Sequence, residues 1–499
     1  MLTGIDYFIV IAYIVGMLLL GLYFKKYVKS SKDYFLGGKS LPFWAIGMSI
    51  VVSDIGALDF VGVSGQAYRY GVSVGNFDWV GSVPAMILAA FIFIPYFWRG
   101  GMYTIPEYLG RRYNKSVRTI ASVTWILFFA LDLGVLFWAS AVLLNVLMGW
   151  PIWVSIFATS GVVGLYTYFG GITAVIMTDV VQMIIMFIGG FTLVFLSLYE
   201  VGGWDNMVTK ISTMGPEYRS HFDIIQPQDT KSPFPWTGIL FGLTFVMANA
   251  YMIGNQSIVQ RCLTAKNEWH AKASMIFGSA LKMFIPFLVL FPGLMAVVVN
   301  PDLADGDQAL PMMIKTILPP GLVGLMFAAF FAGLMSSVDS LLNSTATLFT
   351  KDIYEPYIRK DADDKHYLKV GKITTLVILI FGMVTSPISS KFPGIYVAIQ
   401  TFMSYFQGPL FAILLLGIFW KRTTQWGGLS ALVVGIGFAI FLNVFKDQYF
   451  TIEDPFLYIS WWSFLVGFIV NIVVSLFTKK HTESELKGLV FSSKILTNN

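Results

Sequence analysis

The stretch that decides the fold reads GMSIVVSDIGALDFVG over residues 47–62, where Ser53, Asp54 and Asp59 interrupt an otherwise apolar run. A helix that faces lipid along its whole length would carry no such residues at its middle, because polar groups find no water there. A break at this point frees backbone carbonyls, which must be buried in protein or must line a cavity. The stretch therefore predicts a discontinuous membrane-spanning helix beside a polar cavity.

The rest of the chain has the composition of a membrane protein. Its 499 residues are 56% hydrophobic and 12% charged, whereas soluble domains carry roughly 25% charged residues. A bilayer core requires about 20 apolar residues per helix. We count thirteen such spans, at 4–25, 43–68, 77–98, 119–148, 152–170, 173–199, 236–256, 271–298, 320–349, 369–390, 394–420, 427–445 and 456–478. We expect one transmembrane domain over residues 1–478 and a polar tail over residues 479–499.

The basic residues predict the orientation of these spans. With the N-terminus outside, the loops on the cytoplasmic side hold 25 of the 33 Lys and Arg residues, and the outer loops hold 7. The remaining one, Lys282, falls within a span. Cytoplasmic loops carry an excess of Lys and Arg. We therefore expect a multi-pass protein of the cell membrane with its N-terminus outside and its C-terminus in the cytoplasm.

A second polar interruption occurs five spans after the first. The seventh span contains MANAYMIGNQ over residues 247–256. Two interrupted helices at corresponding places in two sets of five spans indicate a transport site near the bilayer midplane. The alternative is a pair of kinked helices with a structural role.

Ionisable side chains within the spans point to the same region. Each costs several kcal/mol at membrane depth and is a functional candidate by default. Alternatively, any one of them is a paired or neutralised structural group. Together they suggest a polar cavity that handles cations or a hydroxyl-rich solute; they are Asp54, Asp59, Asp78, Asp132, Asp179, Lys282 and Asp339.

Hydroxyl groups gather on one face of the ninth span, where Gly333, Ser336, Ser337 and Ser340 follow one another at spacings of three and four. Facing the free carbonyls of the second span, this face is a plausible cage of oxygen atoms for Na⁺. The single cysteine, Cys262, and four scattered histidines offer no metal or nucleophile constellation.

Several motifs carry a family resemblance over residues 5–478. They read DYFLGGKSLP at 33–42, YTIPE at 103–107, GGITAV at 170–175, TDVVQ at 178–182 and LNSTAT at 342–347. In their order and spacing the chain resembles the sodium:solute symporter family, and especially its sodium/galactose and sodium/glucose cotransporters. The resemblance implies an all-α LeuT-type fold. Two inverted sets of five helices, at about 43–199 and 236–420, then form the core, and the first and sixth core helices are broken.

The resemblance also implies where sodium binds. The first site maps onto the backbone carbonyls of Val52, Ile55 and Gly333 and the hydroxyls of Ser336 and Ser337. Asp54 stands where family members support sodium coupling. A second sodium site, present in some members, maps onto Asp179, Asp339 and Ser340. The carboxylate of Asp339 replaces the usual hydroxyl, which favours a second Na⁺ or a proton there.

For the solute, the resemblance points to a set of polar and aromatic side chains: Asp59, Asp78, Tyr251, Lys282 and Gln400. Three positions depart from the sugar carriers, and we add Asn249 and Asp132 from these positions to the candidate solute residues, which makes seven. Asp59 replaces a neutral or His residue, Ala248 stands where a polar group is usual with Asn249 as its neighbour, and Asp132 stands where Asn can occur. An acidic site of this kind also suits a polyol, an amino sugar or a cationic solute.

Sodium-coupled symport of a small polar solute, with a sugar as the leading class, is thus the predicted function. A polyol, an amino acid or another organic solute is the alternative, and a membrane sensor is the non-transport alternative. We expect no enzyme activity and no organic cofactor, with Na⁺ as the co-transported ion. The expected partners are the solute, Na⁺ and the lipid bilayer, with no nucleic acid and no obligate protein partner.

Overall fold

The computed structural model of the chain describes residues 3–24, 31–169, 172–392, 394–452 and 454–491. Within these ranges the regular structure is helical throughout, and no β-strand occurs. The prediction of an all-α protein is therefore confirmed. Gly170 and Gly171 of one quoted motif, and the last part of the tail at 492–499, lie outside the described residues.

Nine of the described helices are long and apolar enough to cross a membrane, and two bent helix pairs raise this number to eleven. Two shorter apolar helices, Phe43–Asp54 and Ile152–Gly164, coincide with two further predicted spans. Each of the thirteen predicted ranges contains helix where it is described. The chain is a multi-pass membrane protein.

Ten core spans follow one another in two sets of five. The first set consists of α3 (Phe43–Asp54) with η3 (Asp59–Val63) and α4 (Ser64–Tyr70); η5 (Phe77–Ser82) with α5 (Val83–Leu88), η6 (Ala89–Phe93) and α6 (Ile94–Arg99); α8 (Lys115–Met148); α9 (Ile152–Phe169); and α10 (Ile172–Glu200). The second set consists of η8 (Gly238–Met247) with α12 (Ala248–Gly254) and α13 (Gln256–Leu263); α14 (Glu268–Lys282) with α15 (Ile285–Val299); α17 (Leu322–Leu348) with η10 (Phe349–Ile358); α18 (Asp364–Thr385); and α19 (Ile395–Ser404) with α20 (Gln407–Phe419).

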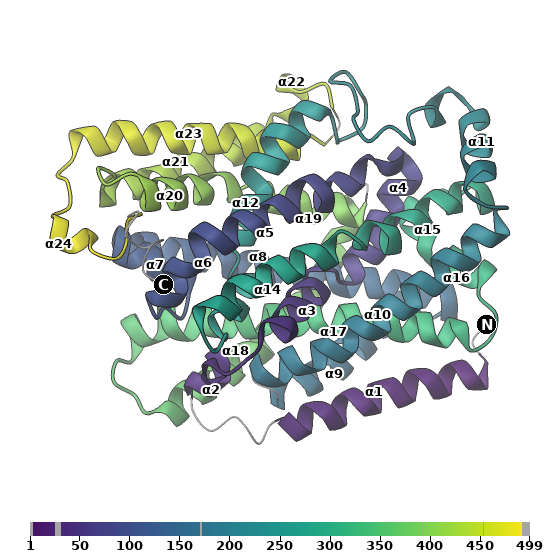
Figure 1. Cartoon of the computed structure of the whole chain (residues 1–499), viewed down its shortest axis with the longest axis horizontal. Coiled ribbons are helices and arrows are strands. Elements are labelled where there is room, and N and C mark those ends of the chain that lie inside the picture. Colours follow the sequence, from purple (N-terminus) through teal and green to yellow (C-terminus); the bar gives the residue numbers. More distant parts are fainter. Residues whose placement is uncertain (1–2, 25–30, 170–171, 393, 453, 492–499) are drawn as a thin grey trace.

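Three further long helices and several short ones complete the bundle. The long ones are α1 (Gly4–Phe24), α21 (Gln425–Val444) and α23 (Phe456–Phe477). Figure 1 shows α1 along one edge of the molecule and α21 and α23 along the opposite edge. The connecting helices are α2 (Ser31–Leu36), η2 (Gly37–Lys39), η4 (Gly71–Gly75), α7 (Ile105–Arg112), α11 (Trp204–Met214), η7 (Pro216–Tyr218), η9 (Gly306–Gln308), α16 (Ala309–Ile317), η11 (Ser386–Lys391), α22 (Lys446–Tyr449) and α24 (Glu483–Leu486).

Both predicted helix breaks are present. Helix α3 ends at Asp54, and Ile55 leaves the helical region with φ −105° and ψ 83°. The sixth core helix bends by 49° between α12 and α13, where Asn255 is extended with φ −73° and ψ 120°. The Asn255 side chain accepts a hydrogen bond from the backbone N–H of Ser257 (2.8 Å), which caps the new helix.

A third break, in the tenth core helix, was not predicted. Helices α19 and α20 meet at an angle of 44°. Pro409 lies in the first turn of α20, where its missing N–H costs no helical hydrogen bond. The sequence signal was therefore present, since a proline favours the start of a helix over its interior.

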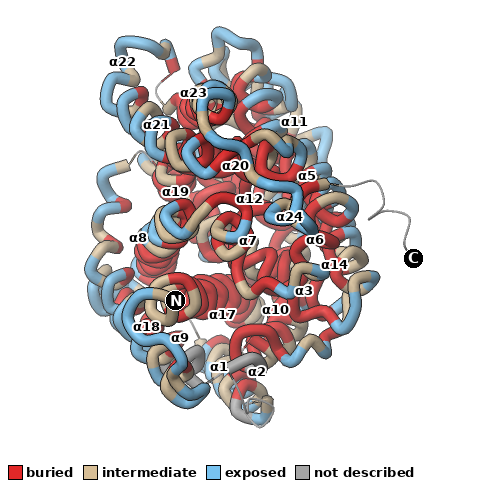
Figure 2. The backbone as a smooth tube through the Cα atoms, turned by 90° about the vertical axis from the view of Figure 1, so that its left-hand side faces the viewer, coloured by how far each residue is buried: buried red, intermediate tan, exposed pale blue. Residues whose placement is uncertain are grey.

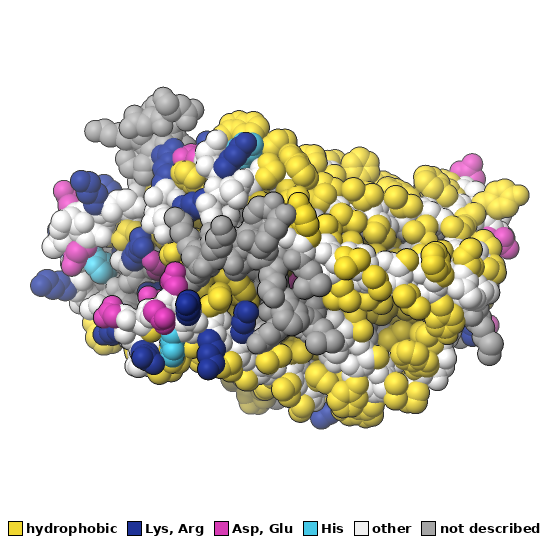
Figure 3. Space-filling model, turned by 90° about the horizontal axis from the view of Figure 1, so that it is seen from below, with side chains coloured by type: hydrophobic (Ala, Val, Ile, Leu, Met, Phe, Trp, Pro, Cys, Tyr) yellow, Lys and Arg dark blue, Asp and Glu magenta, His cyan; other side chains and the backbone are white. Residues whose placement is uncertain are grey.

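Helix α17 forms the centre of the bundle. Nearly every residue from Gly324 to Leu348 is buried, and Figure 2 shows α17 in the colour of buried residues among the other helices. The outer helices instead expose large apolar side chains, such as Phe195 (65% exposed) and Phe477 (86%). An apolar outer surface is what contact with lipid requires. Figure 3 shows Lys and Arg gathered at one end of the molecule, opposite the end where Figure 1 marks the N-terminus.

Candidate functional site

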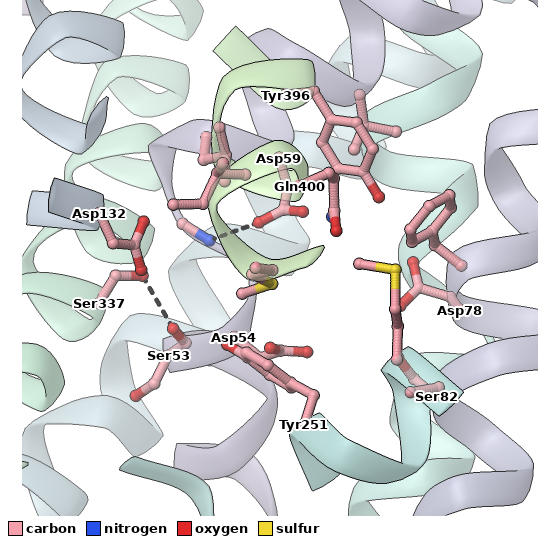
Figure 4. A pocket seen from close by; sticks show the side chains of 18 of the residues that line it. Ser53, Asp54, Asp59, Asp78, Ser82, Asp132, Tyr251, Ser337, Tyr396 and Gln400 are labelled. Atoms are coloured by element: carbon pink, nitrogen blue, oxygen red, sulfur yellow. Dashed lines mark hydrogen bonds between the residues drawn. The ribbon is translucent and has the colours of Figure 1, made fainter. Parts of the chain in front are cut away.

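A polar pocket lies where the broken helices meet (Figure 4). The space between its walls amounts to about 970 Å³, including the part open to solvent. Six of the seven predicted solute residues line it, together with the predicted coupling residue Asp54: Asp59, Asp78, Asp132, Tyr251, Lys282 and Gln400. These residues come from six different core spans, so the pocket exists only in the folded bundle.

Lys282, the last residue of α14, is the positive charge of this pocket. Its Nζ pairs with a carboxylate oxygen of Asp54, lies 2.7 Å from Oδ1 of Asp78 and donates to the Ser82 hydroxyl at 3.3 Å. The Lys282 side chain is only 4% exposed. A buried ammonium is tolerated only with such partners. The three groups thus form an ion triad that joins α3, η5 and α14 across the pocket.

Two further carboxylates have no such partner. Asp59 at the start of η3 accepts a hydrogen bond from the backbone N–H of Gly56 (3.1 Å), which satisfies one donor freed by the break. Asp132 of α8 is 9% exposed and lines the pocket. Among the residues that the structure describes, neither carboxylate is within ion-pair distance of a basic group.

Two aromatic rings in contact with each other line part of the pocket. The rings of Phe77 and Tyr396 meet edge to face, with 5.2 Å between their centroids, and both line the pocket. Tyr396 lies one helical turn before Gln400 on α19, and Figure 4 shows both side chains pointing into the cavity. Sequence reasoning missed Phe77, Tyr396 and Ser82. The spacing of four between Tyr396 and Gln400 was the available signal.

Asn249 does not line the pocket. Its amide donates to the backbone carbonyls of Thr244 (2.9 Å) and Phe245 (3.1 Å), within its own helix. Ala248 and Tyr251, three positions apart, face the cavity instead. Successive residues of an α-helix are rotated by about 100° about the helix axis. Because Ala248 faces the pocket, its neighbour Asn249 points away from the pocket and cannot take the place of a polar side chain at position 248.

The predicted hydroxyl face of α17 packs against the first break. The Ser337 hydroxyl donates to the backbone carbonyl of Ser53 (2.9 Å), and the hydroxyls of Ser53 and Ser336 are 2.5 Å apart. A Cβ on Gly333 would lie 2.8 Å from the Ile55 carbonyl oxygen, so glycine permits this close approach. Hydroxyl and carbonyl oxygens are the hard ligands that alkali cations prefer. Val52, whose backbone carbonyl is also a predicted sodium ligand, is buried in α3 directly before Ser53.

Asp179 of α10 lies next to these hydroxyls and next to a buried arginine. Its Oδ2 accepts hydrogen bonds from Ser49 (2.5 Å) and Ser53 (3.3 Å). Arg261 of α13 donates through Nε to Ser49 (2.7 Å) and through Nη2 to Ser53 (2.6 Å) and to Ser340. Ser340 in turn donates to the Ser336 carbonyl. Of the predicted second-site residues, Asp179 and Ser340 are therefore brought together, and Asp339 is fully buried on the same helix as Ser340.

The position of Arg261 corrects the number of Lys and Arg residues that the sequence assigns to the cytoplasmic loops. The sequence placed it in a cytoplasmic loop, but it is 2% exposed and lies in the second half of the broken sixth core helix. Lys282 is thus joined by a second cation inside the bundle. The surface loops on that side still carry most of the basic residues.

Membrane-spanning helices broken around a shared polar pocket are the architecture of secondary transporters. The comparisons with known proteins support the same class of protein. The model of the sodium:solute symporter family matches residues 34–435. A sodium/glucose cotransporter of Vibrio parahaemolyticus is 33% identical over 94% of this chain and 88% of its own. The human sodium/myo-inositol cotransporter is 30% identical over 98% of this chain and 75% of its own.

Solved structures show the same fold. A substrate-bound, outward-open Na⁺-coupled sialic acid symporter matches with a TM-score of 0.84 and 25% identity over 96% of this chain and 99% of its own. Mhp1, a nucleobase-cation-symport-1 family transporter, matches with a TM-score of 0.60 over 91% of this chain and 97% of its own. At 13% identity, the second match bears on the fold alone. The predicted LeuT-type architecture is confirmed.

The chain belongs to the sodium:solute symporter family. It is a sodium-coupled symporter and not an enzyme, since its relatives and structural neighbours are transporters. Na⁺ and a small solute are what it carries.

Proposed function

We propose that the chain imports a small hydroxyl-rich solute, a sugar or a polyol, together with Na⁺. The observation that carries this proposal is the arrangement of Lys282, Asp78 and Gln400 around one cavity with Tyr251. Vicinal hydroxyls need donors and acceptors side by side, and a sugar ring needs a flat aromatic face. Relatives named for glucose and myo-inositol support this solute class.

For sodium, we propose a site at the first break. The ligands are the backbone carbonyls of Val52, Ile55 and Gly333 and the hydroxyls of Ser336 and Ser337. The close packing of Gly333 on Ile55, and of Ser337 on Ser53, supports this assignment. Asp54 links this site to the solute pocket, because it ends α3 and pairs with Lys282.

Coupling follows from this shared element. A bound ion shifts a conformational equilibrium only if it binds one conformation more tightly than the other. Na⁺ between α17 and the break would hold α3 in the position that presents Asp54 to Lys282. The same position completes the solute pocket, so each ligand favours the binding of the other.

A second cation site at Asp179, Asp339 and Ser340 remains part of the proposal. Arg261 now lies beside Asp179, with 3.5 Å between Nη2 and Oδ2. A cation would bind Asp179 in a conformation in which this guanidinium has moved away. The site is therefore proposed for a state of the transport cycle other than the one described here.

We also propose the orientation and the domain organisation. The Lys- and Arg-rich end in Figure 3 is the cytoplasmic end, and the N-terminus is outside. Residues 1–478 act as one transporter domain, with the inverted repeat at about 43–199 and 236–420, and residues 479–499 form a cytoplasmic tail.

Uptake into liposomes tests the proposal. The purified chain is reconstituted, and accumulation of labelled glucose, galactose, myo-inositol and glucosamine is measured under an inward Na⁺ gradient and under a matched K⁺ gradient. We expect accumulation of at least one of these solutes with Na⁺ alone. Equal accumulation of a solute under both gradients would overturn the proposed Na⁺ coupling. Transport of amino acids but of none of these four solutes would overturn the proposed solute class.

A further inference from the structure

The charges on the pocket wall do not balance. Four carboxylates line the cavity, at Asp54, Asp59, Asp78 and Asp132, against the one ammonium of Lys282. Lys282 is already paired with Asp54 and Asp78. Asp59 and Asp132 remain, and no basic group of the described chain lies within ion-pair distance of either. Buried carboxylates without a cation are costly, and a ligand that supplies one is correspondingly favoured.

Sodium at the hydroxyl site does not remove this imbalance. With all four carboxylates ionised, Lys282 and one Na⁺ still leave two negative charges in excess. Arg261 does not contribute, because its guanidinium is held by Ser49, Ser53, Ser340 and Asp179 and does not line the pocket. The excess therefore belongs to the solute pocket itself.

Asp132 shows where the missing cation would bind. It is nine-tenths buried, lines the cavity and has neither an ion pair nor a hydrogen bond with the described residues. Figure 4 shows its carboxylate on the pocket wall, with Asp59 and Gln400 on other parts of the same wall. A ligand ammonium at Asp132 is thus compatible with ligand hydroxyls at Gln400 and Asp78.

We propose that the solute carries a protonated primary amine on a hydroxylated scaffold, as an amino sugar does, and that Asp132, with Asp59, binds its ammonium. This inference rests on the proposed function, since it names the class of solute within the same pocket. A charged hydrogen bond of this kind should give the amine a preference of about tenfold or more in Kd over a neutral relative.

Matched ligand pairs test the inference on the full chain in detergent, in Na⁺ and at a pH where the amine is protonated. Calorimetry compares glucose with glucosamine and galactose with galactosamine, and the N-acetylated sugars serve as uncharged relatives of the amines. We expect each amine to bind about tenfold or more tightly than its neutral partner and its N-acetyl form. Equal or weaker binding of the amines would overturn the inference, and this comparison needs no variant.

Variants locate the effect. Asp132→Asn should abolish the preference for the amines, measured within the variant as the ratio of the Kd of each neutral sugar to that of its amine. Asp205→Asn, which changes an exposed side chain on α11, should leave this ratio intact. Retention of the preference in Asp132→Asn would refute the assignment. Replacing Na⁺ by K⁺ separates the two proposals. Amine preference without any Na⁺ dependence counts against the proposed coupling alone, whereas Na⁺-dependent binding of neutral sugars with no amine preference counts against the inference alone.

Discussion

Arg261 of α13 and Asp179 of α10 face each other inside the bundle, with 3.5 Å between Nη2 and Oδ2. Both side chains are almost fully buried, at 2% and 0% exposure. They meet at the hydroxyls of Ser49 and Ser53 on α3, so one cluster holds together the first, fifth and sixth core helices. This cluster adjoins the solute pocket, because Ser53 and Ser340, which both accept hydrogen bonds from Arg261, also line that pocket.

Loss of this arginine should destabilise the protein. Arg261→Ala leaves the Asp179 carboxylate buried without its cation, and breaking a buried pair in this way costs about 3 to 5 kcal/mol. We expect a clear fall in the unfolding midpoint of the purified protein, measured by a thermal-shift assay in detergent.

The double variant Arg261→Ala/Asp179→Ala serves as the control, because it removes both charges. It should recover part of the lost stability, since no unpaired charge is left behind. A double variant no more stable than Arg261→Ala would show that the ion pair is not the source of the effect.

Ser337→Ala tests the proposed sodium site. The variant removes a hydroxyl that lies beside the first break and donates to the Ser53 carbonyl. We expect the protein to insert and fold, but to lose Na⁺-driven uptake in liposomes. Ser155→Ala, on α9, removes a hydroxyl that bonds only to the Pro151 carbonyl one turn earlier and should transport normally. Unaltered Na⁺ dependence in Ser337→Ala would exclude this hydroxyl as a ligand.

The sequence predicted the two functional breaks because polar residues at 53–59 and 247–256 contradict an apolar span. The hydroxyl face of α17 followed from a spacing of three and four along one helix. The burial of Arg261 could not be predicted in this way. In the sequence, Arg261 lies near Lys266 between two predicted spans, as a residue of a surface loop would. Only the tertiary packing of α13 on α3 shows that it is buried. The misplacement of Asn249 has a similar cause, since a shift of one residue within a helix changes the face and no pattern within 247–256 decides between them.

Lys282 should be required for solute binding. Lys282→Ala removes the partner of Asp54 and Asp78 and leaves two carboxylates facing each other without a cation. We expect at least about tenfold weaker solute binding, as is usual when a charged hydrogen-bond partner is lost, measured by calorimetry with the best-bound sugar or amino sugar. Lys272→Ala is the matched control, because Lys272 lies on the same helix and pairs with Glu268 at 3.3 Å, away from the pocket. If Lys282→Ala bound the solute as tightly as the unaltered chain, the solute class would have to be revised.

Asp307 should make stability depend on pH. It lies in η9, outside the membrane-spanning helices, and its Oδ2 accepts a hydrogen bond from the backbone N–H of Ile395 (2.9 Å) at the start of α19. Burial, and then the charge of Asp305, raise the pKa of Asp307 to about 7, although the Ile395 hydrogen bond and Arg69 act in the opposite direction. The unfolded chain has a carboxyl pKa of about 3.9. Protonation therefore favours the folded state.

The sign of the effect follows from linkage. Because the folded pKa exceeds the unfolded one, the contribution of Asp307 is fully present below about pH 4 and is lost as the pH rises to about 7. We expect the unfolding midpoint to fall between pH 5 and pH 8, and Asp307→Asn to reduce that fall, because the amide stays neutral throughout. The measurement is a thermal-shift series across this pH range for both proteins. Identical pH profiles for the two would show that another group is responsible.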